Sequence, residues 1–154
     1  MTTTTTDRIE KEVLLQAPRA RVWRALTDPK EFGTWFRAIF TDPFRPGAKV
    51  HGRSTYPGYE HKEFDIVIEK IEPERLFSFR WHPNAIDPDT DYSKEPMTLV
   101  EFTLTEAKGD TLLRLVESGF DRIPVARRAD ALKSNDGGWT EQMKAIEKYV
   151  LQNR

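Results

Sequence analysis

The side chain best placed to do chemistry in this sequence is Glu117. Leu113, Leu115 and Glu117 stand at alternate positions of an expected strand, so they share one of its faces. A carboxylate on an apolar face costs free energy unless it is hydrogen-bonded or ion-paired. Glu117 is therefore a candidate general acid/base or a hydrogen-bonding anchor for a ligand. The alternative is an ion pair with Arg80, Arg53 or another base near the end of the sheet.

Metal and covalent chemistry have little support. The three histidines lie on different expected strands and lack the spacing of a helical metal site; they are His51, His61 and His82. We therefore expect them to be exposed or hydrogen-bonded, and we expect no metal ion. The chain has no cysteine, which excludes a thiolate nucleophile and disulfides, and it has no G-x-S-x-G, P-loop or G-x-G-x-x-G motif. No catalytic constellation is evident, and we expect no cofactor.

Size and charge narrow the class of protein. The 154 residues suit one domain, which we place at residues 7–154 after a disordered tail at residues 1–6. Basic and acidic residues number 24 and 25, and this balance argues against a nucleic-acid surface. No apolar run approaches the roughly 20 residues that cross a bilayer, and the polar tail lacks the features of a secretory signal. We expect a cytoplasmic protein with no nucleic-acid partner and no membrane insertion.

The longest expected element is an amphipathic helix from about Pro124 to Arg154. Its apolar residues recur three or four positions apart, which places them on one stripe. They are Leu132, Trp139, Met143, Ile146 and Val150. Such a stripe needs a broad apolar surface, and the preceding strands can supply it. The simplest architecture is therefore an α+β fold in which a curved antiparallel sheet wraps around this helix.

The preceding chain supplies the other elements in order. The sequence predicts a strand over residues 7–17, a helix after Pro18, and a short helix over Pro29–Phe36 with Asp28 as its cap. Further strands are expected near 48–55, 61–72, 75–82, 97–106 and 111–119, with a hairpin turn at 108–110. Residues 83–96 predict a long surface loop. We favour a variable insertion there over a lip that covers a binding cavity.

Two adjacent glycines interrupt the expected terminal helix. Gly137 and Gly138 together cost about 2 kcal/mol relative to alanine in a helix interior, so a compensating reason is expected. One interpretation is a break before Trp139. The other, which we favour for Gly138, is close approach of the helix backbone to the sheet or to a ligand.

The order of these elements and several short motifs resemble the START-like, helix-grip superfamily also called SRPBCC. The motifs resemble in particular its subfamily related to the C-terminal domain of activators of the heat-shock-protein-ninety ATPase. They are VWRALTDP at 22–29, Trp35-Phe36, Pro46-Gly47, IEPERL at 71–76 with Phe79 and Trp81 after it, and Gly138-Trp139. The resemblance implies a deep cavity between the sheet and the last helix that receives apolar or amphipathic small molecules.

Inward alternation and this resemblance together select twelve candidate ligand-binding residues. They are Trp35, Phe40, His51, Phe64, Phe79, Trp81, Phe102, Leu115, Glu117, Trp139, Met143 and Ile146. The alternative is that most of them only fill the core, because a cavity and a core are lined by the same residue types.

The leading hypothesis is a cofactor-free protein that binds an apolar small molecule. A second hypothesis is a polyketide cyclase- or dehydratase-like enzyme in which Glu117 or His51 moves protons. A third is a protein that binds a partner, such as a chaperone whose ATPase it activates.

Overall fold

The computed structural model describes residues 7–87 and 89–154, so the tail expected at residues 1–6 lies outside the described residues. The strands are β1 (Arg8–Leu15), β2 (Ala38–Phe40), β3 (Lys49–Ser54), β4 (Glu63–Glu72), β5 (Leu76–Trp81), β6 (Thr98–Ala107) and β7 (Asp110–Ser118). The α-helices are α1 (Arg19–Thr27), α2 (Pro29–Phe36) and α3 (Val125–Gln152). Short 3-10 helices occupy Tyr92–Lys94 and Phe120–Arg122.

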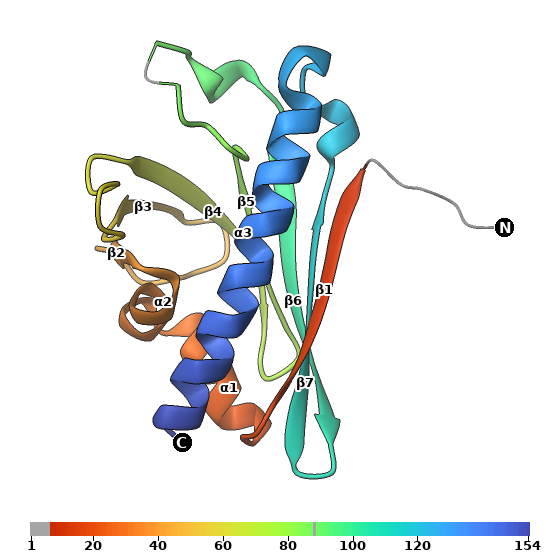
Figure 1. Cartoon of the computed structure of the whole chain (residues 1–154). Coiled ribbons are helices and arrows are strands. Elements are labelled where there is room, and N and C mark those ends of the chain that lie inside the picture. Colours follow the sequence, from red (N-terminus) through yellow and green to blue (C-terminus); the bar gives the residue numbers. More distant parts are fainter. Residues whose placement is uncertain (1–6, 88) are drawn as a thin grey trace, which may run out of the picture.

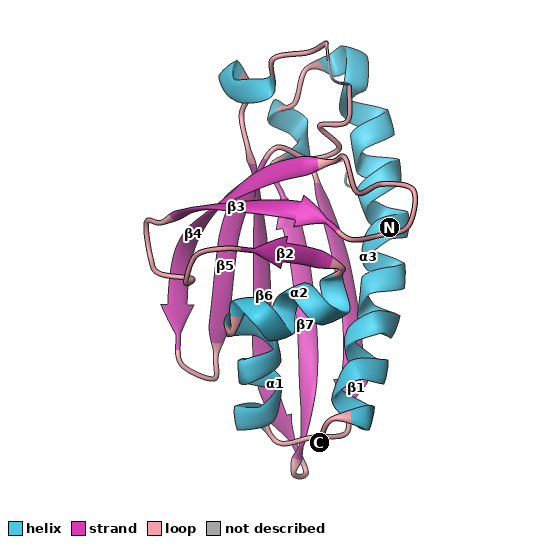
Figure 2. Cartoon of the chain, turned by 90° about the vertical axis from the view of Figure 1, so that its left-hand side faces the viewer, coloured by secondary structure: helices cyan, strands magenta, loops and turns pink. Residues whose placement is uncertain are grey.

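The described strands form one antiparallel sheet in the order β1-β7-β6-β5-β4-β3-β2. Figure 1 shows α3 running along the sheet, with the amino-terminal end of the helix beside the loop between β5 and β6. In Figure 2 the sheet curls, so that β2 and β3 cross in front of the longer strands with α2 beneath them. The expected α+β helix-grip architecture is confirmed. Strand β2 was not expected, because its three residues are too few to carry an alternation pattern.

Local signals explain the α2 helix. The Asp28 carboxylate accepts hydrogen bonds from the backbone N–H groups of Lys30 (2.9 Å) and Glu31 (3.2 Å), and Pro29 occupies the first turn. The predicted span Pro29–Phe36 is confirmed. Arg37 ends the helix in the left-handed region at φ 62°. Its carbonyl oxygen accepts a hydrogen bond from the Thr55 N–H at 3.0 Å, which fixes the chain beyond the helix against the end of β3.

Aromatic rings fill the space that the sheet and helices enclose. Phe32 of α2 is 1% exposed, and its ring lies 6.3 Å from that of Phe77 and 6.4 Å from that of Phe102. Trp35 donates its indole N–H to the Ala25 carbonyl at 2.8 Å, which joins α2 to α1. The expected aromatic inner wall is therefore mostly a packed core, and it stabilises the fold through buried apolar area.

Helix α3 is continuous through both glycines. A methyl group built at Gly137 or Gly138 would meet no heavy atom within 4 Å, so neither glycine approaches the sheet. The predicted break before Trp139 and the predicted close approach of Gly138 to the sheet are wrong, whereas close approach of Gly138 to a ligand stays a prediction. The buried stripe of α3 consists of Ala131, Trp139, Met143, Ile146 and Val150. The glycines lie on the exposed side of the helix because they precede Trp139 by one and two positions, away from this stripe.

The loop between β5 and β6 is attached to the first turn of α3. Arg127 donates hydrogen bonds to the Glu95 carboxylate at 2.8 Å and to the Pro83 carbonyl at 2.8 Å, and its guanidinium lies 4.8 Å from the centre of the Tyr92 ring. This charged contact holds the loop beside the helix.

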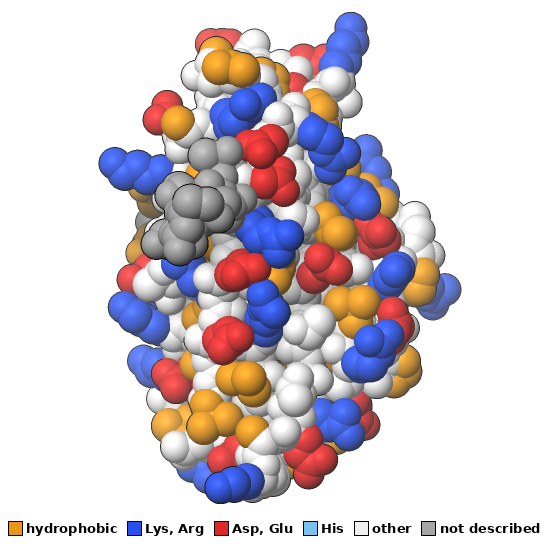
Figure 3. Space-filling view, turned by 90° about the vertical axis from the view of Figure 1, so that its right-hand side faces the viewer, with side chains coloured by type: hydrophobic (Ala, Val, Ile, Leu, Met, Phe, Trp, Pro, Cys, Tyr) orange, Lys and Arg blue, Asp and Glu red, His pale blue; other side chains and the backbone are white. Residues whose placement is uncertain are grey.

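The surface mixes both signs of charge. Figure 3 shows basic and acidic side chains interspersed over the face that carries β1. Among the helices of the described residues, none is both long enough and apolar enough to span a membrane.

The Asp28 cap gives a stability prediction. Asp28→Ala removes the acceptor for two backbone N–H groups and should lower the free energy of unfolding by about 1 kcal/mol in urea titrations. Asp28→Asn keeps an acceptor oxygen and serves as the control. Equal stability of Asp28→Ala and the parent protein would contradict the assigned cap.

Candidate functional site

Glu117 is the polar centre of the interior. It is 0% exposed and lies in the inward-facing row of β7, as its register predicts. One carboxylate oxygen accepts hydrogen bonds from Trp81 Nε1 (2.7 Å) and Thr98 Oγ1 (2.6 Å). The other accepts from Trp139 Nε1 (2.8 Å) and Asn135 Nδ2 (3.0 Å). The carboxylate therefore joins the ends of β5 and β6 to the middle of α3.

The alternative that Glu117 forms an ion pair with Arg80, Arg53 or another base is wrong. Among the described residues its hydrogen-bond partners are all neutral groups. Arg80 pairs with Glu69 instead, because neighbouring residues of a strand face opposite sides of the sheet and Trp81 faces inward. Arg53 is exposed on β3. Neutral donors satisfy the buried oxygens, which offsets much of the cost of removing the carboxylate from water.

Three aromatic rings form a floor in front of this carboxylate. The ring centres of Trp81 and Trp139 lie 5.8 Å apart, and Phe36 lies 6.1 Å from the first and 6.0 Å from the second. Because both indole N–H groups point back to Glu117, the orientation of two of the three rings is fixed from behind. We call Phe36, Trp81 and Trp139 the aromatic floor.

A groove of about 190 Å³ lies over the aromatic floor. Its remaining lining residues are Ser134, Asn135, Gly138 and Gln142, all from α3. The Gln142 amide donates to the Phe36 carbonyl at 3.2 Å, which ties α3 to the end of α2. Since Gly138 has no side chain, the groove is open at the helix.

The groove continues toward the C-terminal end of α3. An adjoining depression of about 470 Å³ shares Phe36, Gly138 and Gln142 with it. Its other lining residues are Trp35, Arg37, Tyr56, Glu141, Lys144, Ala145 and Lys148. We call this depression the basic extension. A separate depression of about 490 Å³ between α2 and β2 contains Phe40 but no buried polar group, so it is a weaker candidate.

The structure separates the twelve candidate residues into groups. Trp81 and Trp139 line the groove, Trp35 lines the basic extension, and Glu117 lies behind the floor. The others that face the interior are buried in the core or packed against it: Phe40, Phe64, Phe79, Phe102, Leu115, Met143 and Ile146. These seven apolar candidates therefore contribute to the core, and their contact with a ligand stays a prediction.

His51 lies apart from all of these. Its side chain is half-exposed on β3, with Nδ1 2.9 Å from an Asp65 oxygen and Nε2 3.0 Å from a Glu63 oxygen. The hydrogen bond to Asp65, followed by that to Glu63, raises the pKa of His51 above its usual value. His51 therefore links β3 to β4 at the surface.

The geometry gives little basis for proton transfer by Glu117 or His51. A general acid or base must reach the substrate directly or through one water molecule. Glu117 is covered by its donors, and His51 is not among the residues that line the groove. Within residues 7–87 and 89–154, no group of three or more His, Cys, Asp or Glu side chains is placed to hold a metal ion.

Sequence reasoning missed several polar members of the site. Asn135 lies four residues before Trp139 and Gln142 three residues after it, so all three share one side of the helix. That spacing could have identified them. Thr98 begins β6 directly opposite Trp81 in the sheet, and only the strand register reveals this contact.

An antiparallel sheet that grips a long C-terminal helix defines the helix-grip, START-like class of proteins. A family model described as "Activator of Hsp90 ATPase homolog 1-like protein" matches residues 16–151. The chain belongs to this family, as the sequence motifs indicated. No protein of curated function matches the sequence significantly.

Solved structures share the fold. DynU16, from the dynemicin biosynthetic locus, is 25% identical with a TM-score of 0.72; the match covers 96% of this chain and 48% of that chain, so this chain spans about half its length. MLL2253 from Mesorhizobium loti is 22% identical over 96% of this chain and 98% of that chain, with a TM-score of 0.75. The Aha1 dimer from Colwellia psychrerythraea is 14% identical over 93% of this chain and 95% of that chain, with a TM-score of 0.70.

The buried carboxylate gives a prediction at the site. Glu117→Gln replaces one acceptor oxygen by an NH₂ group that faces indole or amide donors, so at least one buried donor loses its partner. We expect the free energy of unfolding to fall by about 1–3 kcal/mol in urea titrations. Glu69→Gln, at the Arg80 ion pair on the other face of the sheet, is the control and should cost less. An unchanged stability of Glu117→Gln would contradict the hydrogen-bonded network.

His51 gives a prediction for pH dependence. Because its folded-state pKa is raised, the stability that it contributes is fully present below the unfolded-state pKa and is lost as pH rises through the folded-state pKa. His51→Gln should therefore cost more stability at about pH 5.5 than at about pH 8.5, on either side of the usual histidine range. The difference should be only about 0.5 kcal/mol because the pairs are exposed. A larger cost at the higher pH would contradict this assignment.

Proposed function

We propose that the protein binds an apolar or amphipathic small molecule in the groove over the aromatic floor. The observation that carries this proposal is the aromatic lining of the groove, in which the partly exposed rings of Phe36 and Trp81 lie against the 2% exposed Trp139 beside a helix position without a side chain. Ligand sites combine an apolar lining with a few polar groups that fix orientation. Here Asn135 and Gln142 are such groups.

Preorganisation further supports this proposal. Glu117 holds the two indoles through hydrogen bonds that need no ligand, so little side-chain freedom remains to be lost on binding. The aromatic rings also suit planar apolar groups, which stack or contact edge to face with aromatic side chains.

A second candidate function follows from the family description. We infer that the chain could bind a protein partner such as an Hsp90-type chaperone, since the family is described by that activity. This candidate predicts stimulation of a chaperone ATPase by micromolar concentrations of the purified protein. No stimulation would contradict it and would leave the small-molecule proposal untouched.

A cyclase-like activity is less well supported because Glu117 and His51 do not line the groove.

The two glycines of α3 provide a matched test of the small-molecule proposal. Gly138 lines the groove, whereas its neighbour Gly137 does not. Either position accepts a Cβ without a clash. Replacing either glycine by leucine should stabilise the helix by roughly 0.5–1 kcal/mol. Any difference in binding between the two variants therefore reports on the groove and not on the helix.

We predict that Gly138→Leu weakens binding of the neutral fluorescent probe N-phenyl-1-naphthylamine, because the new side chain occupies the groove. The loss should be about tenfold or more, equal to at least about 1.4 kcal/mol. Gly137→Leu should leave the affinity within about twofold. Fluorescence titration measures both. Equal affinities in the two variants, or no saturable binding to the parent protein, would overturn the proposal.

A further inference from the structure

We infer, on the basis of the proposed function, that the ligand is an aromatic or apolar anion. Its apolar part lies on the aromatic floor, and its anionic group lies in the basic extension near Arg37 and Lys148. The charges around the groove and the buried charge behind it both favour this arrangement.

The cations of the basic extension are not neutralised equally. Lys144 lies 3.4 Å from the Glu141 carboxylate, so these two charges largely cancel. Arg37 and Lys148 are exposed, and among the described residues neither has an acidic partner within ion-pair distance. The basic extension therefore carries an excess of positive charge that an anionic group complements.

The backbone and a neighbouring ring position Arg37. Its N–H donates to the Gly33 carbonyl at the end of α2, and its left-handed conformation leads the chain into β2. The guanidinium lies over the Tyr56 ring, 5.0 Å from its centre. This stacking leaves the N–H groups at the guanidinium edge available to an anionic group, the geometry in which arginine binds carboxylates and sulfonates.

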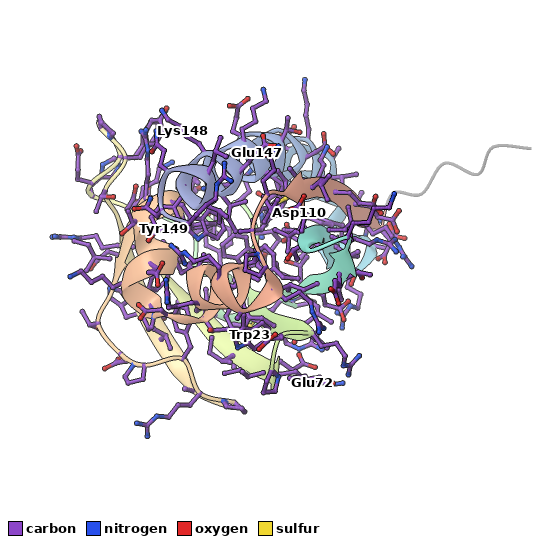
Figure 4. The ribbon with its side chains drawn as sticks, turned by 90° about the horizontal axis from the view of Figure 1, so that it is seen from below. Trp23, Glu72, Asp110, Glu147, Lys148 and Tyr149 are labelled. Atoms are coloured by element: carbon purple, nitrogen blue, oxygen red, sulfur yellow. The ribbon has the colours of Figure 1, made fainter. Side chains whose placement is uncertain are left out.

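Lys148 completes the basic extension from α3. Figure 4, which looks at the molecule from the C-terminal end of α3, shows Lys148 and Tyr149 at this end of the helix. The Tyr149 hydroxyl donates to Glu31 of α2 at 2.8 Å, so this part of α3 is fixed relative to α2. The two cations therefore come from separate elements that are joined by a direct contact.

The charge of Glu117 favours the anionic group of the ligand in the basic extension over the same group on the aromatic floor. Its carboxylate is behind Trp81 and Trp139 and has no basic partner among the described residues, so it repels a negative charge placed on the aromatic floor. Lys148 lies nine residues beyond Trp139 on α3, roughly 13.5 Å along the helix axis, so the same charge beside Lys148 lies farther from Glu117. The groove thus has an electrostatic polarity that matches an amphipathic anion.

The test uses two probes with one aromatic skeleton. 8-Anilino-1-naphthalenesulfonate is the sulfonate of N-phenyl-1-naphthylamine, so the ratio of their affinities isolates the contribution of the anionic group. The double variant Arg37→Gly/Lys148→Gln removes both cations, and glycine is compatible with the positive φ at position 37. The control is Lys108→Gly/Lys133→Gln, which also removes one lysine at positive φ and one on α3, away from the groove and its extension.

We expect Arg37→Gly/Lys148→Gln to lower the ratio of sulfonate to neutral affinity roughly fivefold to tenfold, through the sulfonate alone. The control variant should leave the ratio within about twofold, and added salt should weaken only the sulfonate. An unchanged ratio, or an equal fall in the control, would overturn the inference. If Gly138→Leu weakens the binding of both probes but Arg37→Gly/Lys148→Gln leaves the affinity ratio unchanged, the inference fails and the proposed function stands. If Gly138→Leu affects neither probe, the proposed function itself fails.

Discussion

The buried carboxylate of Glu117 is the interaction on which the site depends. A charged group inside a protein is tolerated only when hydrogen bonds replace those it made with water. Here donors from β5, β6 and α3 converge on one side chain of β7, and each of them would also be costly to leave unpaired. The carboxylate needs these donors, and each donor needs the carboxylate as its acceptor. These hydrogen bonds therefore fix the position of α3 relative to the sheet more specifically than apolar packing alone would.

The same interaction limits where a ligand can lie. Phenylalanine and tryptophan rings occupy much of the space between sheet and helix, and the groove opens at the edge where α2, β5 and α3 meet. At this edge the indoles of Trp81 and Trp139 donate inward to Glu117, and the partly exposed rings of Trp81 and Phe36 line the groove together with the 2% exposed Trp139. The hydrogen bonds of Glu117 thereby preorganise the aromatic floor. The negative charge of Glu117 favours a ligand whose anionic group lies in the basic extension.

The elements with strong local signals were predictable from the sequence, whereas features set by tertiary contacts were not. Asp28 and Pro29 define the start of α2 within a few residues, and the alternation at Leu113, Leu115 and Glu117 gives the inward face of β7. The short strand β2 has no such pattern and exists because it pairs with β3. Glu117 was expected to be buried, but its neutral partners come from three distant segments, and no local spacing indicates them. The predicted approach of Gly138 to the sheet was wrong because the sequence does not state which neighbours surround an exposed helix position.

The central claim is that Glu117 holds Trp81 and Trp139 as the floor of a ligand groove, and the indole N–H signals of the four tryptophans test it most directly. In a ¹⁵N–¹H spectrum assigned by Trp→Phe variants, N-phenyl-1-naphthylamine should shift the Trp81 and Trp139 signals while both remain protected from solvent exchange. Trp23 of α1 lines neither the groove nor its extension and should not respond. Rapid exchange of the Trp81 and Trp139 signals, or probe-induced shifts that spare both, would contradict the account.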